Sequence, residues 1–230
     1  MKLSVIIPVY NEQDTIVQTI NQVMESTPQL NKEIIVVNDG STDDTMQRIE
    51  NSKYPGLVLI NQPKNTGKGA ALRAGIQKAS GDIIIIQDAD LEYTPGDYPA
   101  LLQPILEDRA DVVFGTRLQG GGGPQRVLFF WHYLGNKMLT TLSNIFTNLN
   151  LSDMEVGLKV FRSGIIKNIK LRENRFGFEP EITAKVAKLN CRIYEVPISY
   201  YGRTYKEGKK IGLKDAFSAL RCIIKYALMD

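Results

Sequence analysis

Short runs of apolar, mostly β-branched residues recur along the first half of the chain, separated by stretches of mixed character. Five of these runs predict buried strands, at residues 3–9, 33–37, 57–60, 83–86 and 111–114. The mixed stretches between them predict helices near residues 16–24, 43–52, 67–79 and 95–109. Strands and helices that alternate in this order form right-handed βαβ units. We therefore expect an α/β fold in which helices flank a mostly parallel sheet.

The second half of the chain has longer amphipathic stretches. Residues 127–149 predict a helix whose first positions are unusually apolar and include the only tryptophan. Such a helix can lie in the plane of a membrane surface, although an apolar stripe more often packs in a core. The amphipathic tail, 213–228, has Phe217, Leu220, Ile224 and Leu228 on one side. Between these helices we expect a strand at 157–161, a helix at 179–189 and a strand at 193–198.

Four consecutive glycines, Gly120 to Gly123, separate the two halves of the chain. Glycine has no side chain to pack and a large conformational freedom. Two interpretations remain open: a plain linker, or a loop beside the site that becomes ordered when substrate binds.

The strand at 83–86 runs into three alternating acidic residues, Asp88, Asp90 and Glu92. In extended chain, residues two apart point the same way, so these carboxylates can converge just past the strand end. Such a cluster needs a cation, and oxygen ligands suit Mg²⁺ or Mn²⁺. The alternative is an acidic loop that holds no metal. Asp39 also directly follows a predicted strand, and we expect it at the same edge, where open α/β sheets bind ligands.

The formal net charge of +3 is too small to indicate nucleic-acid binding. Basic residues are concentrated in the segment 201–225, which contains Arg203, Lys206, Lys209, Lys210, Lys214, Arg221 and Lys225. A basic segment fits a phosphate-bearing ligand or an anionic membrane surface, and a solvated helix face is the alternative.

Targeting and cysteine patterns predict a cytoplasmic protein. Cys191 and Cys222 give no disulfide framework. The first residues resemble a strand rather than a signal peptide, and no apolar run reaches the ~18–20 residues that span a bilayer. We therefore expect no transmembrane segment, and any membrane contact would be peripheral or through a partner.

Several common catalytic motifs are missing from the sequence. No Gly-x-Gly-x-x-Gly follows the first strand, and His132 is the only histidine, which disfavours a dehydrogenase, a Ser-His-Asp hydrolase and a zinc enzyme. Gly67-Lys68-Gly69 could bind a phosphate at a helix start, or form only a tight helix entry. What remains is a metal–carboxylate site with the separated basic residues Lys68, Arg117, Arg126, Arg203 and Lys209. This combination is typical of enzymes that use a nucleoside-diphosphate donor.

The absence of a histidine base bears on the acceptor. A displacement at a sugar carbon normally needs a base to deprotonate an acceptor hydroxyl. A phosphate monoester needs none, because its second pKa is near ~6 and its oxygens are already ionised. Such an acceptor needs cations to hold it, and the chain has them.

Five motifs, taken in order, resemble family 2 glycosyltransferases of the GT-A fold. They are Ser4-Val-Ile-Ile-Pro-Val-Tyr-Asn-Glu12, Val37-Asn-Asp-Gly-Ser-Thr-Asp43, Asn65-Thr-Gly-Lys-Gly69, Asp88-Ala-Asp90 and Gly115-Thr-Arg117. The later Glu195-Val-Pro-Ile-Ser199, followed by Arg203 and Lys209, looks like the dolichyl-phosphate mannose synthase branch of that family.

The resemblance implies a role for each matching residue. Residues of the nucleotide-base pocket would be Pro8, Tyr10, Glu12, Val37 and Asp39. The metal would be carried by Asp88 and Asp90, and Ala89 would lie against the nucleotide. Glu92 joins this metal set only through the alternation of acids described above, because mannose synthases often have Gln or Ser at its position. Phosphates of donor or lipid would be held by Arg117, Arg203 and Lys209, and Asp153 matches an aspartate near the reacting centre.

The resulting hypothesis is one glycosyltransferase domain over residues 1–230, with a nucleotide-sugar-binding half at 1–119 and an acceptor-binding half at 120–230. With Mg²⁺ or Mn²⁺ it would move a sugar, with inversion, from GDP-mannose, UDP-glucose or a UDP-N-acetylhexosamine to a polyprenyl phosphate. We expect it to act at the cytoplasmic face of a membrane, with the membrane surface or a membrane subunit as a partner. The alternatives are a saccharide hydroxyl acceptor, with Asp153 or Glu181 as the base, and a non-catalytic nucleotide-sugar-binding subunit.

Overall fold

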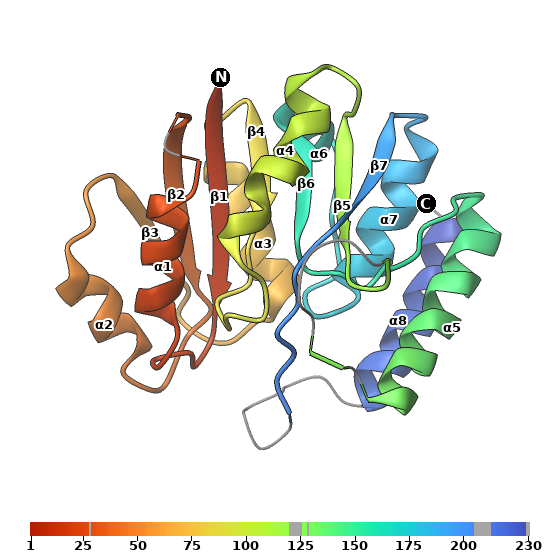
Figure 1. Cartoon of the computed structure of the whole chain (residues 1–230). Helices are drawn as coiled ribbons and strands as arrows, with labels where there is room; N and C mark the ends of the chain where they lie inside the picture. The colour runs from red at the N-terminus through yellow and green to blue at the C-terminus, as the bar shows by residue number, and fades with distance from the viewer. Residues whose placement is uncertain (28, 120–125, 128, 205–212, 229–230) are drawn as a thin grey trace.

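A seven-stranded sheet runs through the middle of the computed structural model, which describes residues 1–27, 29–119, 126–127, 129–204 and 213–228 (Figure 1). Its strands are β1 (Lys2–Val9), β2 (Asn31–Asn38), β3 (Leu57–Asn61), β4 (Ile83–Ile86), β5 (Val112–Thr116), β6 (Lys159–Arg162) and β7 (Ile193–Pro197). Their order across the sheet is β3-β2-β1-β4-β6-β5-β7. Because β6 is antiparallel to both of its neighbours while the other pairs are parallel, the predicted mostly parallel sheet is confirmed.

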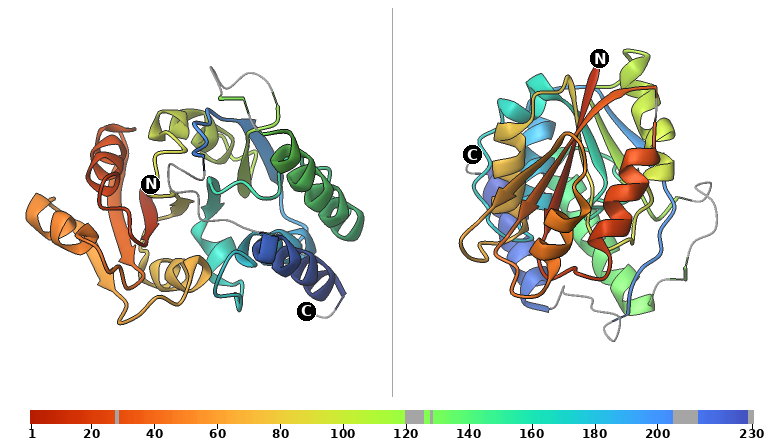
Figure 2. Two further views of the ribbon diagram at one scale, coloured as in Figure 1. Left: turned by 90° about the horizontal axis from the view of Figure 1, so that it is seen from below. Right: turned by 90° about the vertical axis from the view of Figure 1, so that its left-hand side faces the viewer.

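Helices cover both faces of this sheet (Figures 1 and 2). They are α1 (Ile16–Glu25), α2 (Thr45–Ser52), α3 (Lys68–Lys78), the 3₁₀ turn η1 (Pro95–Asp97), α4 (Tyr98–Leu106), α5 (Phe130–Thr147), α6 (Ser163–Lys167), α7 (Phe178–Lys188) and α8 (Leu213–Leu228). One face carries α1 and α4, and the other carries α3, α6 and α7. The α/β class predicted from the alternating pattern is therefore confirmed.

The isoleucine run of β4 lies at the centre of the sheet, between β1 and β6. All four isoleucines, Ile83 to Ile86, are buried, because helices cover the sheet on both sides. The parallel strands β1, β2 and β4 end at one edge, so the residues that follow Val9, Asn38 and Ile86 come together there. This edge is where the acidic residues predicted to bind ligand are found.

The long helices α5 and α8 lie side by side near the β7 edge of the sheet (Figure 2). Each leaves large apolar side chains in solvent, and we call this set the exposed apolar residues: Phe130, Trp131, Leu134, Met138 and Ile145 of α5, with Phe217, Ile224 and Leu228 of α8. The buried positions of α5 are instead Leu139, Thr140 and Ser143. The expectation that an apolar stripe on the 127–149 helix packs in the core is therefore wrong for most of that stripe.

In the part of the chain that the structure describes, no helix is both long and apolar enough to cross a bilayer. Some predicted features lie outside the described residues, namely Gly120 to Gly123, Lys206, Lys209 and Lys210.

Candidate active site

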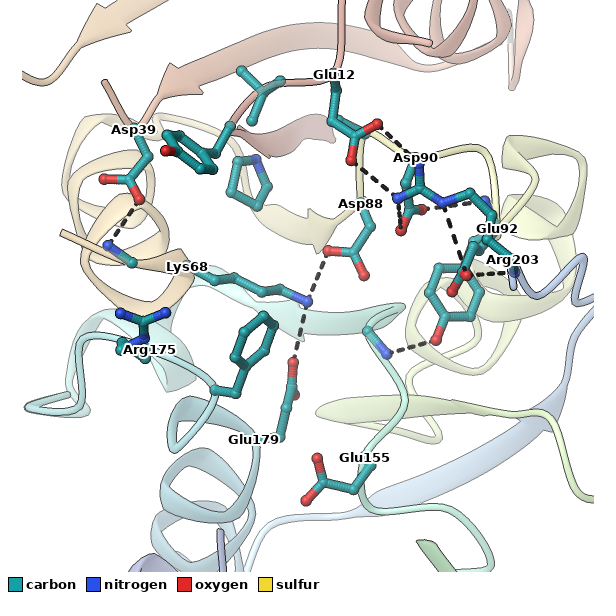
Figure 3. Close-up of a pocket in the computed structure, with 18 of the residues that line it drawn as sticks. Glu12, Asp39, Lys68, Asp88, Asp90, Glu92, Glu155, Arg175, Glu179 and Arg203 are labelled. Carbon is teal, nitrogen blue, oxygen red and sulfur yellow. Dashed lines mark hydrogen bonds and ion pairs between the residues drawn. The ribbon is translucent and has the colours of Figure 1, made fainter. Parts of the chain in front are cut away.

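A pocket of about 310 Å³ opens at the edge where the parallel strands end (Figure 3). Eleven of the residues singled out in the sequence line it: Pro8, Tyr10, Glu12, Asp39, Lys68, Asp88, Ala89, Asp90, Glu92, Arg117 and Arg203. These residues come from positions 8 to 203, so the fold joins motifs that are far apart in the chain. Val37 does not line the pocket, since it is fully buried within β2, and its expected place in the base pocket is not observed.

Asp39 holds the glycine-containing loop that leads into α3. Its carboxylate accepts hydrogen bonds from the backbone N–H groups of Thr66, at 2.8 Å, and Gly67, at 2.7 Å. Gly67 has a φ of +106°, and a Cβ there would lie 2.4 Å from the backbone oxygen of Asn174. Only glycine fits this turn. Gly67-Lys68-Gly69 therefore forms a tight helix entry that carries Lys68 into the pocket.

Lys68 is the cation at the centre of the pocket (Figure 3). Its Nζ lies 2.7 Å from Oδ1 of Asp88 and 3.3 Å from Oε1 of Glu179. Burial by itself disfavours the charged amine, but the carboxylates of Asp88 and Glu179 outweigh it and raise the pKa of Lys68 above its ordinary value. Lys68 is therefore a permanent positive charge that is positioned to contact an anionic ligand.

The three alternating acids do not converge on one point. Oδ2 of Asp90 lies 3.2 Å from the guanidinium of Arg203, whereas Asp88 faces Lys68. Glu92 accepts hydrogen bonds from the Tyr200 hydroxyl, at 3.0 Å, and from the backbone N–H of Arg203, at 2.7 Å. The reason is that β4 ends at Ile86 and Leu91 adopts a φ of +62°, so the chain is not extended and the alternation rule fails.

Within the described ranges, no group of three or more His, Cys, Asp or Glu side chains is arranged to hold a metal ion. The predicted trio of Asp88, Asp90 and Glu92 is therefore wrong as a preformed metal site. The pair Asp88 and Asp90 still suits a hard cation, because both carboxylates line the pocket. Burial, followed by the charges of Asp88 and Glu92, raises the pKa of Asp90 to about 7 against the opposing charge of Arg203. A bound divalent cation would relieve this repulsion.

Arg203 connects the ends of two strands across the pocket. Its guanidinium donates to both carboxylate oxygens of Glu12, at 3.1 and 3.0 Å, as well as to Asp90. Glu12 follows β1 and Asp90 follows β4, so the single side chain of Arg203 closes this side of the pocket. Bidentate pairing of this kind fixes the plane of the guanidinium.

Arg117 is held by Asp153, which lies behind it. Asp153 is fully buried and accepts from Nε of Arg117 at 2.6 Å, from an NH2 group at 2.7 Å and from the Arg117 backbone at 3.1 Å. Burial favours the neutral acid, but the Arg117 charge outweighs it and holds the pKa of Asp153 below its ordinary value. Arg117 lines the pocket and Asp153 does not. Asp153 therefore positions Arg117 and is poorly suited to act as a base.

Glu181, the other acid considered as a base, also lies outside the pocket lining. It is fully buried and accepts from the backbone N–H groups of Arg172 and Glu173, both at 2.7 Å. Its Oε1 also lies 2.8 Å from Nζ of Lys185. These contacts give Glu181 a structural role in holding the segment before α7.

Comparison with known proteins identifies the family. The model of the family described as glycosyl transferase family 2 matches residues 4–170. The chain belongs to this family. Glycosyl transferase family 2 is the group that the five motifs resembled, and the pocket described above is where those motifs meet.

Among curated relatives, a dolichol-phosphate mannosyltransferase of Pyrococcus furiosus is 30% identical over 100% of this chain and 64% of its own length. An undecaprenyl-phosphate mannosyltransferase of Micrococcus luteus is 28% identical over 92% of this chain and 88% of its own length. The chain therefore spans just under two thirds of the Pyrococcus relative and most of the Micrococcus one.

The solved structures show the same fold. Glucosyl-3-phosphoglycerate synthase of Mycobacterium tuberculosis, in complex with Mn²⁺, UDP and phosphoglyceric acid, superposes with a TM-score of 0.78 at 21% identity, over 100% of this chain and 79% of that one. The same enzyme in complex with Mg²⁺ and UDP gives a TM-score of 0.73. The GT-A fold predicted from the motifs is confirmed.

Several residues of this glycosyl transferase family 2 pocket were not found from the sequence. They are Tyr93, His132, Glu155, Gly157, Arg175, Phe176, Glu179 and Tyr200. The ring of Tyr200 lies 5.1 Å from the guanidinium carbon of Arg117 and 5.5 Å from the ring of Tyr93. His132, the only histidine in the sequence, lines the pocket from α5. Among these residues, the only signal in the sequence was for Glu179, which lies in the acidic stretch at the start of α7.

Proposed function

We propose that this chain transfers a sugar from a nucleoside-diphosphate donor to a polyprenyl phosphate, with inversion at the sugar carbon. The observation that supports this most directly is the pocket in which Asp88 and Asp90 are set among the cations Lys68, Arg203 and Arg117. Such a pocket suits a diphosphate with its metal ion. The names of the Pyrococcus and Micrococcus relatives support a polyprenyl-phosphate acceptor.

Asp88 and Asp90 would hold Mg²⁺ or Mn²⁺, which neutralises charge on the diphosphate leaving group when it is bound. Lys68 and Arg203 then face the same phosphates and steady the charge that develops as the donor bond breaks. An oxygen of the acceptor phosphate forms the new bond to the sugar carbon, and the bonding electrons leave with the diphosphate. Pro8, Tyr10, Glu12 and Ala89 would line the space for the nucleotide.

Arg117 is assigned to the acceptor phosphate or to the charge that develops beside it. Its guanidinium is fixed by Asp153 and by the Tyr200 ring, so it is presented to the pocket with little freedom to reorient. Because a phosphate acceptor is already ionised near neutral pH, the reaction needs no general base. This agrees with the structural roles of Asp153 and Glu181.

The acceptor is a lipid, and we propose that α5 and α8 approach the membrane surface. Trp131 is 78% exposed and Phe217 is 73% exposed, and both belong to the exposed apolar residues. Large apolar side chains that are exposed on two neighbouring helices commonly mark a membrane or protein contact. Peripheral binding through these helices would bring the pocket near a lipid head group at the cytoplasmic face.

The test is the transfer of radiolabel into an organic-extractable product. Purified protein receives polyprenyl phosphate, Mn²⁺ and, in parallel, labelled GDP-mannose, UDP-glucose or UDP-N-acetylglucosamine. We expect lipid-phase label from one donor, and its loss in Asp90→Ala, whose thermal melting should stay close to that of the wild type. Lipid-phase label that persists in Asp90→Ala would contradict the metal assignment. No label from any donor, with donor binding intact, would contradict the lipid acceptor.

A further inference from the structure

Glu155 has a carboxylate oxygen that no group in the described part of the protein satisfies. It lines the pocket from the segment between α5 and β6, and its Oε1 is buried with no hydrogen-bond partner among the described residues. The other carboxylates of the pocket all have partners, as shown above for Glu12, Asp39, Asp88, Asp90, Glu92 and Glu179. A buried acceptor without a donor is unfavourable, so a donor from outside the protein is expected to reach it.

The backbone around Glu155 is held firmly on both sides. Asp153 is fixed by Arg117, and the N–H of Gly157 donates to the Tyr93 hydroxyl at 3.1 Å. Between them, Nζ of Lys159 donates to the carbonyl oxygens of Met154, at 3.3 Å, and Val156. These contacts therefore hold the backbone that carries the Glu155 carboxyl group in place before any ligand arrives.

The charged groups that act most strongly on the Glu155 carboxyl are Glu179, Lys159, Arg117 and Asp153. Both cations are already paired, Lys159 with Glu179 and Arg117 with Asp153. Burial, and then the Glu179 charge, raise the pKa of Glu155 to about 7. An anionic phosphate oxygen would be repelled here. A neutral group with hydroxyl donors fits both the unsatisfied oxygen and the surrounding charges.

The position of Glu155 in the pocket indicates which part of the donor would supply the hydroxyl groups that its carboxyl can accept from. In Figure 3 it lies on the far side of Asp88 from Glu12, next to Glu179, whereas Asp39 lies at another side of the pocket. It is also within electrostatic reach of Arg117, the residue assigned above to the reacting phosphate. The group that lies between the diphosphate and the acceptor is the sugar being transferred.

We propose that Glu155 is a sugar-recognition residue whose carboxyl accepts hydrogen bonds from hydroxyl groups of the transferred sugar. This inference rests on the proposed function. It makes Glu155 a specificity residue: it would discriminate among donors by their sugar, while the nucleotide would be bound by the other end of the pocket. Losing an acceptor from a site built for hydroxyl groups should weaken the binding of the sugar nucleotide. The binding of the free nucleotide should be unaffected.

The test compares two affinities in each variant by titration calorimetry at fixed Mn²⁺. GDP is paired with GDP-mannose, and UDP with UDP-glucose and UDP-N-acetylglucosamine, for wild type, Glu155→Gln, Glu155→Ala and the exposed control Glu50→Gln. We expect Glu155→Ala to raise the Kd of the sugar nucleotide about tenfold while the Kd of the free nucleotide is unchanged. Glu50→Gln should change neither Kd. Glu155→Gln, which keeps one acceptor oxygen, should fall between wild type and Glu155→Ala.

Each other outcome has a distinct meaning. Equal Kd ratios in wild type and both Glu155 variants would overturn the inference while leaving the proposed function intact. A wild-type protein that binds no sugar nucleotide would contradict the proposed function itself. A fall in Mn²⁺ affinity without nucleotide would make Glu155 a cation ligand and overturn the sugar role. A purely structural Glu155 would lower the melting temperature on Glu155→Ala, whereas we expect no decrease.

Discussion

At the scale of single residues, the Arg117–Asp153 pair gives a test that separates a positioning role from a catalytic one. Both groups are buried, so removing the carboxylate leaves the Arg117 charge without its partner. We predict that Asp153→Ala lowers the free energy of unfolding by about 3–5 kcal/mol, as measured by urea denaturation. The exposed Asp14→Ala is the control and should change stability little. Wild-type stability with lost turnover in Asp153→Ala would instead indicate that Asp153 acts as a base.

Glu155 predicts a specific dependence of stability on pH. Its pKa is about 7 in the folded protein against an ordinary value of 4.5, so folding favours its protonated form. Protonated Glu155 contributes its full share of stability below about pH 4.5, and this contribution is lost as the pH rises through 7. Relative to wild type, Glu155→Gln should therefore gain on the order of 2 kcal/mol between pH 5 and pH 8. Urea denaturation of wild type and Glu155→Gln across this pH range measures the difference. If the free energies of unfolding of the two proteins changed in parallel with pH, the shifted pKa would be contradicted.

Several of the pocket residues that the sequence could identify follow strands directly. Asp39 and Asp88 were found because the carboxyl ends of parallel strands meet at one edge, and the structure places both there. Glu92 was misplaced because the left-handed backbone at Leu91 ends the alternation, and no residue type at that position signals it. Glu155 and Tyr200 come from irregular segments whose course depends on distant partners, so local pattern could not place them.

At the scale of helices, sequence located α5 and α8 but did not identify which side faces the protein. The reason lies in Thr140 and Asn144 on α5. Thr140 accepts from the backbone N–H of Met154 at 3.1 Å, and Asn144 bonds both backbone groups of Leu151. These polar residues fix the segment that carries Asp153 and Glu155, so they must face inwards. The apolar stripe is consequently left in solvent, which the spacing of apolar residues alone does not reveal.

The exposed apolar residues give a prediction for membrane binding. Replacing Trp131 and Phe217 together by serine should reduce the affinity for phospholipid vesicles at least tenfold, because the loss of two large apolar side chains removes on the order of 2 kcal/mol of transfer free energy. Vesicle co-sedimentation measures this, with Met24→Ser on α1, another exposed apolar residue, as the control. Unchanged vesicle binding would contradict the membrane role. A change in oligomeric state instead would show that these helices form a protein interface.

At the scale of the whole molecule, the pocket couples ligand binding to global stability, since its walls come from residues as far apart in the chain as Pro8 and Arg203. Arg203 joins the residues after β1 and β4, and Lys68 joins Asp88 to Glu179 at the start of α7. A ligand that binds only the folded state at 100 times its Kd stabilises it by about 2.7 kcal/mol. For a domain of this size we predict a rise in melting temperature of roughly 5–11 °C with Mn²⁺ and the matching nucleoside diphosphate.

The same measurement tests how Asp90 contributes to that stabilisation. If Asp88 and Asp90 hold the metal ion, the melting temperature of Asp90→Ala with nucleotide should no longer depend on Mn²⁺, and EDTA should reduce the wild-type shift to the same level. The ligand-free Asp90→Ala protein should melt no lower than wild type. Burial and the acidic neighbours raise the pKa of Asp90 to about 7, so its charged form is unfavourable in the folded protein. Asp14→Ala should retain the full Mn²⁺-dependent shift. A Mn²⁺-dependent rise in melting temperature that survives in Asp90→Ala would place the cation elsewhere in the pocket. Lys68 and Arg203 would then be the groups that face the diphosphate, with no cation held at Asp90.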